Sequence, residues 1–492
     1  MVMRQSGLGS ILRVSFPLAA LLGATPGSRL IAQGAAPSVQ ARIDRVVTCL
    51  RQPLYLRADP CVNLAERMAA LHVTGVSVAV IHQGRLEWSR GFGVERAGGK
   101  PVTPETRFQA GSISKPVAAM AALHLVEEGK LGLDQDANAE LSSWKIPLGP
   151  EAVGKAVTLR ELLTHTAGTT VHGFPGYAHG EPVPTLVQVL NGEAPANTPV
   201  IKVATVPGSQ WNYSGGGFTI MQMMAVDAAK EPFPKLMHDV VLSPIGMRHS
   251  TYDQPLPTAE TRSATPYNQD GTPVAGGPHT YPEMAAAGLW TTASDLARYI
   301  IENQRSLVGN ANHVLSQAMT KQMLTPGIGN WGLGVQIGGS KEDPYFTHEG
   351  VNAGFESVFV AYENHGDGAV VMTNAQGGQR LAKELLQSIA TEYDWPNFRG
   401  KMMVKLDPSI LEKYAGTYDL APSSSLTFTV EGNQLFGAMN HQGKTPIFAE
   451  SETHFFLKVA DVQIDFLKDG QGQVTGVVVH QNGEDQKGVR RK

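Results

Sequence analysis

The stretch Phe108-Gln-Ala-Gly-Ser-Ile-Ser-Lys115 leads into the apolar segment Val117-Ala-Ala-Met-Ala-Ala-Leu123. This pattern predicts a long helix from about Ser112 to Glu128, because apolar helix formers follow one another until a glycine stops them. Ser112 and Lys115 are three residues apart, so they share one face of that helix and the hydroxyl can meet the amine. The spacing therefore favours a serine nucleophile paired with a lysine base.

A lysine can act as such a base only in a special environment. Its pKa is normally about 10.4, and burial lowers it by disfavouring the ammonium form. The apolar residues after Lys115 predict this burial, and a serine at a helix start also offers its own N–H to an oxyanion. A second Ser-x-x-Lys copy, Ser142-Ser-Trp-Lys145, has no long apolar helix behind it and is interpreted as a surface loop.

Strands are predicted at both ends of this region, and the middle, over residues 141–282, is rich in glycine and proline with short helices. A helix over 43–71 comes first. The predicted strands are 75–82, with a turn at Gln83-Gly84 into a partner from Leu86, and then 332–337, 355–362 and 369–373, followed by a helix over 381–393. The pattern indicates one mixed sheet that draws together distant parts of the chain.

The composition changes after about Lys405, where short alternating strands dominate. They are predicted at residues 426–430, 434–439, 462–467 and 474–479 and are separated by glycine-containing turns. Such a series is typical of a small antiparallel sheet or barrel.

The whole chain has 492 residues, enough for two or three domains, with 42% hydrophobic and 17% charged residues. Its formal net charge of −4 provides no basic field for nucleic acid or anionic membranes. The sequence therefore predicts a soluble globular protein that binds no nucleic acid.

The N-terminus has the order of a secretory signal. Arg4 and Arg13 precede the apolar run Val14–Ala24, and small residues follow from Ala32. That run is shorter than the roughly 20 residues that span a bilayer, so no stable membrane span is expected. Export would allow Cys49 and Cys61 to form a disulfide, and the alternative is two unpaired thiols.

Six segments resemble successive landmarks of the class C β-lactamase and D-Ala-D-Ala carboxypeptidase superfamily, in the family's order, over about residues 64–393. They are Phe108-Gln-Ala-Gly-Ser-Ile-Ser-Lys115, Thr158-Leu-Arg-Glu-Leu-Leu-Thr-His-Thr-Ala-Gly168, Pro207-Gly-Ser-Gln-Trp-Asn-Tyr-Ser-Gly215, Pro244-Ile-Gly-Met247, Ala287-Gly-Leu-Trp-Thr-Thr-Ala-Ser-Asp295 and Thr347-His-Glu-Gly-Val-Asn-Ala-Gly-Phe355. Six such segments in order are very hard to reach by accident.

The resemblance implies roles for the matching residues. Ser112 would be the acylated nucleophile, Lys115 its base and Tyr213 a proton shuttle, with a phenol pKa that the nearby lysine lowers. Glycine at Gly350 would let a substrate lie along the strand edge, and the N–H of Val351 would be the second oxyanion donor beside that of Ser112.

Two positions depart from the family's pattern. Gly215 replaces the asparagine of the Tyr-x-Asn element, which removes an amide that would orient the lysine and a substrate. His348 replaces the lysine of Lys-Thr-Gly in His348-Glu349-Gly350, and a histidine is only partly charged at neutral pH, so it should attract a substrate carboxylate weakly. Relatives that resemble esterases and D-amino-acid-specific peptidases carry His-x-Gly at this place.

Other polar and aromatic residues receive structural interpretations. His165, His172 and His179 lie among glycines and a proline, so no shared helix face or metal site is expected, and His165 is expected to make a structural hydrogen bond. Glu349 is expected to be solvated, and the alternative is that it tunes His348. Trp211 and Trp290 are expected either in the core or along the cleft.

Together these features predict an α/β (α+β) β-lactamase/transpeptidase-like domain, with an antiparallel sheet flanked by helices, over residues 33–400. A signal peptide over 1–32 precedes it and a lipocalin-like β-domain over 405–492 follows. The predicted function is a periplasmic or secreted serine hydrolase of small esters, amides or D-amino-acid peptides, without metal or cofactor. The alternatives are a true β-lactamase and a penicillin- or peptidoglycan-binding protein with little turnover, and a homo-oligomer is left open.

Overall fold

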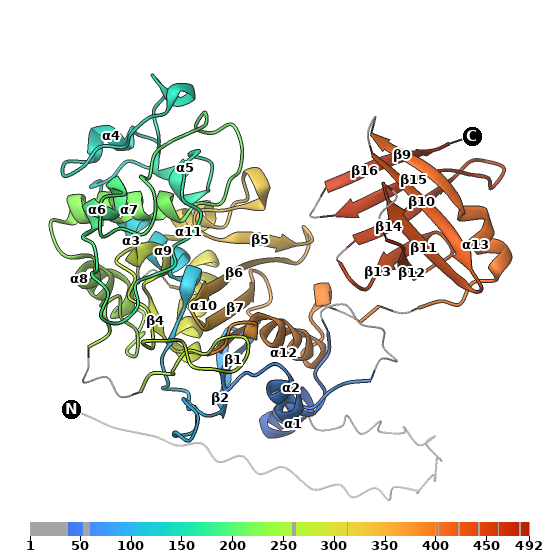
Figure 1. The fold of residues 1–492 in the computed structure, drawn as a ribbon, viewed down its shortest axis with the longest axis horizontal. Coiled ribbons are helices and arrows are strands. Elements are labelled where there is room, and N and C mark those ends of the chain that lie inside the picture. Colours follow the sequence, from blue (N-terminus) through green and yellow to red (C-terminus); the bar gives the residue numbers. More distant parts are fainter. Residues whose placement is uncertain are drawn as a thin grey trace, which may run out of the picture. The chain divides into compact units, whose positions relative to one another are not determined.

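A six-stranded sheet forms the centre of the larger part of the chain in the computed structural model (Figure 1). Every strand pairing is antiparallel, so the expectation of a mixed sheet is wrong, whereas the antiparallel sheet implied by the resemblance is confirmed. In spatial order the strands are β2 Arg85–Gly93, β1 Gly75–His82, β8 Gly368–Thr373, β7 Phe355–Tyr362, β6 Pro344–Asn352 and β5 Gln336–Gly339.

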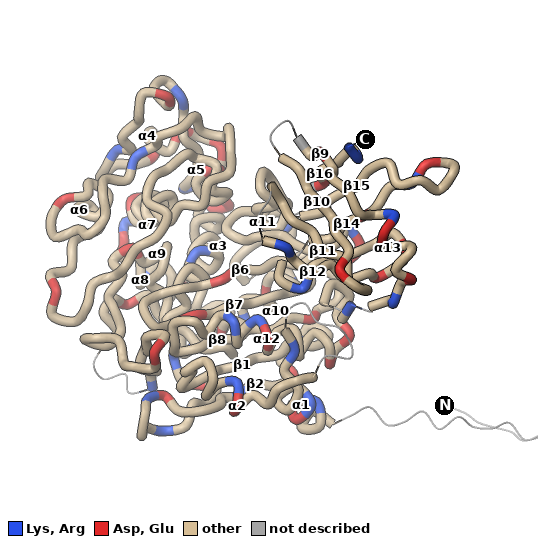
Figure 2. Tube along the Cα trace, turned by 45° about the vertical axis from the view of Figure 1, so that its right-hand side comes forward, with Lys and Arg blue, Asp and Glu red and all other residues tan. Residues whose placement is uncertain are grey.

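The structure describes residues 38–52, 60–257, 262–311, 313–398, 400–401, 403–421, 424–440, 443–460, 462–481 and 484–491. The predicted signal segment over residues 1–32 lies outside them. Within the described ranges, no helix combines the length and the apolar character needed to cross a bilayer. Segments with lysine and arginine and segments with aspartate and glutamate are interspersed over the described chain (Figure 2), in keeping with the small net charge.

Helices cover both faces of the sheet, so its central strands are apolar on both sides. In β1, Ala79 and Ile81 pack into one core with α3, while Val78 and Val80 pack into another with α1 and α12. The helices are α1 Val39–Thr48, α2 Leu64–Ala70, α3 Ser114–Glu127, α4 Ala137–Glu140, α5 Leu159–Leu163, α6 Leu186–Asn191, α7 Gly215–Ala229, α8 Phe233–Met237, α9 Met284–Ala287, α10 Ala293–Leu307, α11 Gln317–Met323 and α12 Gly378–Glu392. A short ladder pairs β3 Phe108–Gln109 with β4 Trp290–Thr291.

The single helix predicted over 43–71 is wrong, because α1 and α2 are separate helices. A disulfide joins Cys49 to Cys61 between them, and Leu50 pairs its backbone with Val62. The side chain of Asn63 then accepts a hydrogen bond from the Ala65 N–H and caps the start of α2. The chain therefore reverses where the sequence pattern suggested a continuous helix, and the disulfide alternative for the two cysteines is confirmed.

The C-terminal segment forms a closed eight-stranded barrel, which confirms the predicted all-β domain (Figure 1). Tyr414, Phe428, Phe455 and Phe466 pack together in its interior, with Tyr414 stacked on Phe466 and the other pairs edge to face, and α13 Pro408–Tyr414 supplies Tyr414. Its strands are β9 Gly416–Ala421, β10 Ser424–Glu431, β11 Gln434–Met439, β12 Thr445–Ala449, β13 His454–Leu457, β14 Val462–Lys468, β15 Val474–Gln481 and β16 Glu484–Arg490.

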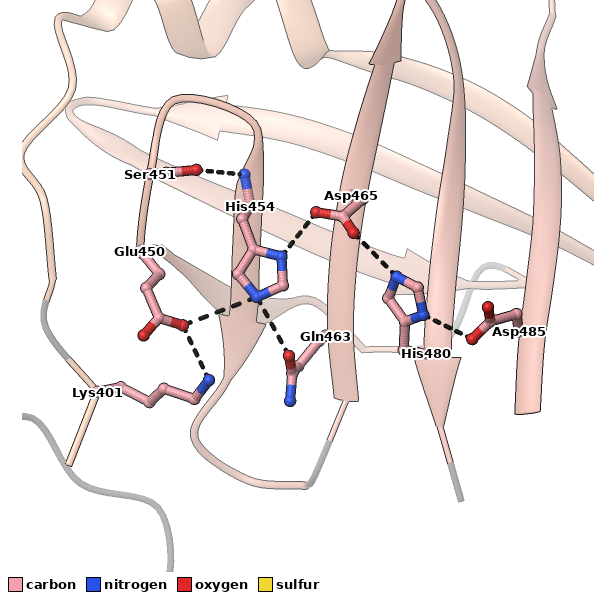
Figure 3. A network of polar contacts seen from close by, with 8 residues as sticks. All are labelled: Lys401, Glu450, Ser451, His454, Gln463, Asp465, His480 and Asp485. Atoms are coloured by element: carbon pink, nitrogen blue, oxygen red, sulfur yellow. Dashed lines mark hydrogen bonds and ion pairs between the residues drawn. The ribbon is translucent and has the colours of Figure 1, made fainter. Parts of the chain in front are cut away.

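A polar ladder crosses the last four barrel strands (Figure 3). His454 Nδ1 lies 2.6 Å from Asp465, and His480 lies between Asp465 at 2.9 Å and Asp485 at 2.6 Å. Burial lowers the pKa of His480, but the hydrogen bonds to Asp485 and Asp465 outweigh it and the pKa is raised overall. The ladder therefore favours a charged imidazolium between two carboxylates.

Candidate active site

Ser112 lies in a 3-10 turn, Gly111–Ile113, immediately before α3. The predicted helix over 112–128 is confirmed as α3 over Ser114–Glu127, except that its first residues form the 3-10 turn. Gly111 has φ +53°, and a Cβ on it would lie 2.9 Å from the carbonyl carbon of Gly350 on β6. A Cβ on Gly350 would in turn collide with the carbonyl oxygen of Ala110. Glycine at both positions therefore lets the backbone before Ser112 lie directly against β6.

Lys115 is buried at the start of α3, with only 2% of its surface exposed. Its Nζ lies 2.9 Å from Ser112 Oγ and 2.9 Å from the carbonyl oxygen of Ala286 in α9. The same atom lies over the ring of Tyr213, 5.0 Å from the centroid, and 5.8 Å from that of Phe218. The structure thus brings together the three residues that the sequence proposed as catalytic.

Burial lowers the pKa of Lys115 from its usual value to about 7. The carbonyl oxygen of Ala286 accepts a hydrogen bond from either protonation state of the amine, so the neutral form keeps its position. Near neutral pH a substantial fraction of Lys115 is therefore uncharged and able to accept the proton of Ser112.

Tyr213 is held by backbone contacts just before α7. The N–H of Asn212 donates to the His165 carbonyl at 2.8 Å, and the N–H of Ser214 donates to His165 Nδ1 at 3.1 Å. His172 donates from Nδ1 to the carbonyl oxygen of Tyr213 itself. The structural hydrogen bond expected of His165 is confirmed, and its ring packs 4.3 Å from that of Tyr213.

The expectation that Lys115 lowers the pKa of Tyr213 is wrong. Burial raises the pKa of the phenol well above its usual value, and the hydrogen bond with Ser112 opposes this only in part. A lysine whose own pKa is about 7 carries too little charge to stabilise a phenolate. Tyr213 is therefore a neutral phenol that can donate a proton.

His348 is buried on β6 and is uncharged. Burial and the nearby charge of Lys115 lower its pKa to about 3. The expectation of a partly charged histidine came from the reference value and is wrong, because it took no account of this environment. Its neighbour Glu349 points to the other face of the strand, where it pairs with Lys383 of α12 at 2.7 Å and also bonds to Gln379. Its side chain is 48% exposed, so the expectation of a solvated carboxylate is confirmed.

Gly215 is buried at the first position of α7, where the family's asparagine would stand. A Cβ on it would lie 2.9 Å from Phe174 Cε2 and 3.2 Å from the carbonyl oxygen of His172. The loop that carries these two residues fills the space of an amide side chain. The absence of asparagine is therefore built into the packing next to Tyr213.

Val351 and Gly350 lie on β6 at the point where its neighbour ends. β5 pairs only with residues Pro344–Thr347, so its ladder stops one residue before His348. The side chain of Val351 lies on the exposed face of β6, opposite the buried face that includes Gly350, and is 54% exposed. The β5 ladder therefore does not extend along residues 348–352, the part of β6 that lies against the segment before Ser112.

Two buried residues near the site were missed in the sequence. Trp331 packs between His165 at 5.0 Å and His348 at 5.6 Å, measured between ring centroids. Glu283 occupies the N-cap position of α9 without a capping hydrogen bond from its side chain. Its carboxyl oxygens are buried without a hydrogen-bond partner among the described residues, and burial raises its pKa to about 7. Neither lies in a motif, so no sequence signal marked them.

The remaining candidates have structural roles. Ser143 and Lys145 of the second Ser-x-x-Lys copy bond to Asp227 and to backbone carbonyls, in a segment without helix, as predicted. Trp290 is buried in β4, while Trp211 is 37% exposed and packs 6.5 Å from Tyr213. Within the described part of the chain, histidine, cysteine and acidic side chains form no group of three suited to a metal ion.

Family models match most of the chain. The family model described as Beta-lactamase matches residues 63–392, and one described as Domain of unknown function (DUF3471) matches residues 401–490. Penicillin-binding protein 4* of Bacillus subtilis is 22% identical over 87% of this chain and 98% of its own length. A Beta-lactamase of Pseudomonas fluorescens is 30% identical over 52% of this chain and 65% of its own.

Solved structures show the same fold. The octameric penicillin-binding protein homologue from Pyrococcus abyssi superposes with a TM-score of 0.56 at 20% identity, covering 87% of this chain and 98% of that one. D-alanine carboxypeptidase AmpC from Burkholderia cenocepacia gives 0.54 at 22% identity, covering 71% and 100% respectively. With its β-lactamase/transpeptidase-like fold and a family match over residues 63–392, the chain belongs to the β-lactamase family of serine hydrolases.

Proposed function

We propose that this protein is a serine hydrolase that acts through an acyl-enzyme on Ser112, with small esters, amides or D-amino-acid peptides as substrates. The observation that carries the proposal is the buried amine of Lys115, 2.9 Å from Ser112 Oγ and with its pKa lowered to about 7. A neutral amine at hydrogen-bond distance is what a serine needs to become a nucleophile near neutral pH.

The proposed reaction uses the three side chains in turn. Neutral Lys115 takes the proton of Ser112 as Oγ attacks the substrate carbonyl carbon. The phenol of Tyr213 then gives its proton to the leaving oxygen or nitrogen as that bond breaks, and the ammonium of Lys115 returns a proton to the phenolate. Water attacks the resulting ester on Ser112 and releases the acid.

The oxyanion of the tetrahedral intermediate needs donors at the same place. The N–H groups of Ser112 and Val351 are the proposed pair, because Gly111 and Gly350 bring their two segments into backbone contact. Fixed backbone donors of this kind contribute a factor of about 10² to 10³ in rate for each donor.

The neutral His348 argues for substrates without a carboxylate at its position. A β-lactam or a peptide C-terminus carries that carboxylate, and the lysine that would attract it is absent. Ester or amide hydrolysis is therefore favoured over efficient cephalosporinase activity. One neighbour in fold, SurE, was solved with D-Leu, and this makes D-amino-acid amides worth testing.

A penicillin-binding protein with little turnover is the second candidate, and Gly215 favours it. The missing amide beside Tyr213 would weaken the orientation of substrate and of the groups that activate water, so an acyl-enzyme would form and persist. Penicillin-binding protein 4* of Bacillus subtilis, which matches this chain over 98% of its own length, is named for that kind of binding.

Turnover of a short p-nitrophenyl ester and of a chromogenic cephalosporin tests the proposal on the wild type and on Ser112→Ala. We expect steady ester turnover that the variant loses, and cephalosporin turnover that is at least about 100-fold lower, a difference of about 2.7 kcal/mol in transition-state binding. Equal or faster cephalosporin turnover would identify a true β-lactamase. A single burst followed by no turnover would favour the slow penicillin-binding alternative.

We also propose that the protein is periplasmic or secreted. The predicted signal at residues 1–32 and the disulfide between Cys49 and Cys61 support an oxidising compartment. The homologue from Pyrococcus abyssi is octameric, so a homo-oligomer is a reasonable expectation for this chain. Size-exclusion chromatography with light scattering would measure it.

A further inference from the structure

His165 lies in the turn that ends α5 and has an uncommon backbone conformation. Its φ is +60°, in the left-handed region, and the N–H groups of Thr166 and Ala167 donate back to the carbonyl oxygen of Glu161. Glycine, or sometimes asparagine, is the usual residue at such a helix end, because larger side chains are strained there. A histidine at this position therefore calls for a use of its side chain.

His165 holds the two residues that flank Tyr213. Its carbonyl oxygen accepts from the N–H of Asn212 at 2.8 Å, and its Nδ1 accepts from the N–H of Ser214 at 3.1 Å. One hydrogen bond therefore uses the main chain of His165, and the other uses its ring. Together they fix the backbone on both sides of Tyr213, and with it the direction in which the phenol leaves the chain.

The imidazole of His165 also packs against the phenol ring itself. The two ring centroids lie 4.3 Å apart, and Trp331 and Phe218 lie at 5.0 and 5.3 Å from the imidazole. Only 2% of the surface of His165 is exposed. The imidazole is therefore enclosed by aromatic rings, and it forms a fixed wall on which the phenol rests.

The hydrogen bond from Ser214 requires a neutral imidazole. An N–H group can only donate, so Nδ1 offers its lone pair and the ring proton is on Nε2. Burial, together with the nearby charge of Lys115, lowers the pKa of His165 well below its usual value. The acceptor is therefore present throughout the pH range in which Lys115 changes its charge.

The phenol of Tyr213 has to meet more than one group. It hydrogen-bonds with Ser112, and its ring lies 5.0 Å from the Nζ of Lys115, measured to the centroid. In the proposed reaction the phenol gives its proton to the leaving group and regains one from Lys115, and both transfers need hydrogen-bond distances. A displacement of about 1 Å can cost about 10²-fold in rate. A side chain that sets the position of the phenol should therefore set the rate of these transfers.

We propose that His165 is a positioning residue, whose Nδ1 acceptor holds Tyr213 where the phenol can protonate the leaving group. The inference rests on the proposed acyl-enzyme function and deepens it, because it assigns a second residue to the proton transfer from Tyr213. It predicts that changes at His165 lower the rate for leaving groups that need a proton, and spare those that depart without one.

An ethyl ester and a p-nitrophenyl ester of the same acid test this, because ethoxide needs a proton to depart and p-nitrophenolate does not. His165→Gln moves the side-chain acceptor one bond beyond the place of Nδ1. It should lower kcat/KM for the ethyl ester about 10- to 100-fold, and that for the p-nitrophenyl ester less than about 3-fold. His165→Asn places an oxygen where Nδ1 lies and suits the left-handed backbone, so it should keep the wild-type ratio of the two esters within about 3-fold.

The same comparison in Tyr213→Phe shows whether His165 acts through the phenol. Without the phenol there is no proton donor to position, so His165→Gln should add less than about 3-fold to the loss that Tyr213→Phe causes on the ethyl ester. His124→Gln is the matched control, because His124 is a histidine in the last turn of α3 whose ring bonds to the carbonyl oxygen of Val314. It should keep the wild-type ratio. Each sample is first titrated with a fluorophosphonate, so that rates refer to reactive Ser112.

The outcomes distinguish this inference from the function on which it rests. A folded wild type that a fluorophosphonate does not label would contradict the acyl-enzyme itself. If labelled His165→Gln loses kcat/KM on both esters by one common factor, or on neither, or if its loss adds fully to that of Tyr213→Phe, the positioning role is overturned. Should His165→Gln fail to fold, His165→Asn decides, because a folded, labelled asparagine variant that has lost the ethyl ester rate would overturn the acceptor role.

Discussion

Lys115 shows how one residue's environment determines its chemistry. Among the described residues no carboxylate contacts its amine, and burial alone brings its pKa to about 7. The unfolded chain therefore binds more protons than the folded one between about pH 7 and the usual lysine pKa of 10.5, so this residue's contribution to stability rises with pH in that window. As pH falls from 10.5 this contribution is lost progressively, and the loss is complete at about pH 7, because both states are protonated below that pH. A reactive amine near neutral pH is thus obtained at the expense of folding free energy.

The pH dependence of acylation tests this assignment. Because the neutral amine is the active form, we expect kcat/KM for a p-nitrophenyl ester to rise with pH and level off above an inflection near 7. Lys115→Arg keeps a cation that does not deprotonate and should lower the rate by about 10²- to 10⁴-fold at every pH. A wild-type profile that falls with pH across this range would contradict a base at Lys115.

The contribution of Tyr213 to the rate should be larger for leaving groups that need a proton in order to depart. Its raised pKa keeps the phenol protonated, so that a proton is present to be transferred. A p-nitrophenolate leaves well without a proton, whereas an amine does not. Tyr213→Phe should therefore lower hydrolysis of an amide by about 10²- to 10⁴-fold and that of the p-nitrophenyl ester of the same acid much less. Equal losses on both substrates would indicate a positioning role for the ring instead.

At the scale of elements, the contact between the Ser112 turn and β6 is the feature that assembles the site. A methyl group on Gly350 would meet the carbonyl oxygen of Ala110 with no space to give. Gly350→Ala should therefore separate the two segments, lower the free energy of unfolding by about 1–3 kcal/mol and abolish fluorophosphonate labelling.

Gly470→Ala serves as the control for that substitution. A Cβ on Gly470 would have no atom within 4 Å, and its backbone needs no positive φ. Its thermal unfolding and labelling should match those of the wild type. A Gly350→Ala protein that labels at the wild-type rate would show that the close backbone contact is not needed to shape the site.

The sequence predicted elements well where local pattern and burial agree. The run Gly75–His82, the hairpin turn at Gln83-Gly84 and the strand Phe355–Tyr362 match β1, its turn to β2, and β7. The short strands β12 and β13 of the barrel were not predicted. They lack a long alternating run, and they form because they complete the closed barrel. The break between α1 and α2 was missed, although the sequence holds a cap for α2 at Asn63 and a cysteine pair, Cys49 and Cys61, that joins the two ends of the break.

In the candidate site, too, the sequence predicted the residues that lie in local motifs and missed those that only tertiary packing brings there. Ser112, Lys115, Tyr213 and the His348-Glu-Gly350 element lie in local motifs, and the structure brings them together. Their pKa values depend on burial by distant segments of the chain. The sequence therefore predicted the wrong pKa shift for the phenol of Tyr213 and too much positive charge for the imidazole of His348. Trp331 and Glu283 reach the site only through tertiary packing, and no spacing in the sequence points to them.

At the scale of the whole molecule, the two predicted domains have separate hydrophobic cores. The cores on either side of the central sheet are formed by residues before 399, and the barrel core is formed by residues after 405. A chain that ends at Gly400 should therefore fold and label with a fluorophosphonate at a rate within about 3-fold of the full chain. Loss of labelling in a chain that still folds would assign the barrel a part in the site.

The most direct test of the central claim is the intact mass of the protein after incubation with a fluorophosphonate. We expect one adduct on the wild type and on Ser142→Ala, which alters the other Ser-x-x-Lys serine, and none on Ser112→Ala. An adduct that persists on folded Ser112→Ala, or a folded wild type without any adduct, would contradict an acyl-enzyme on Ser112.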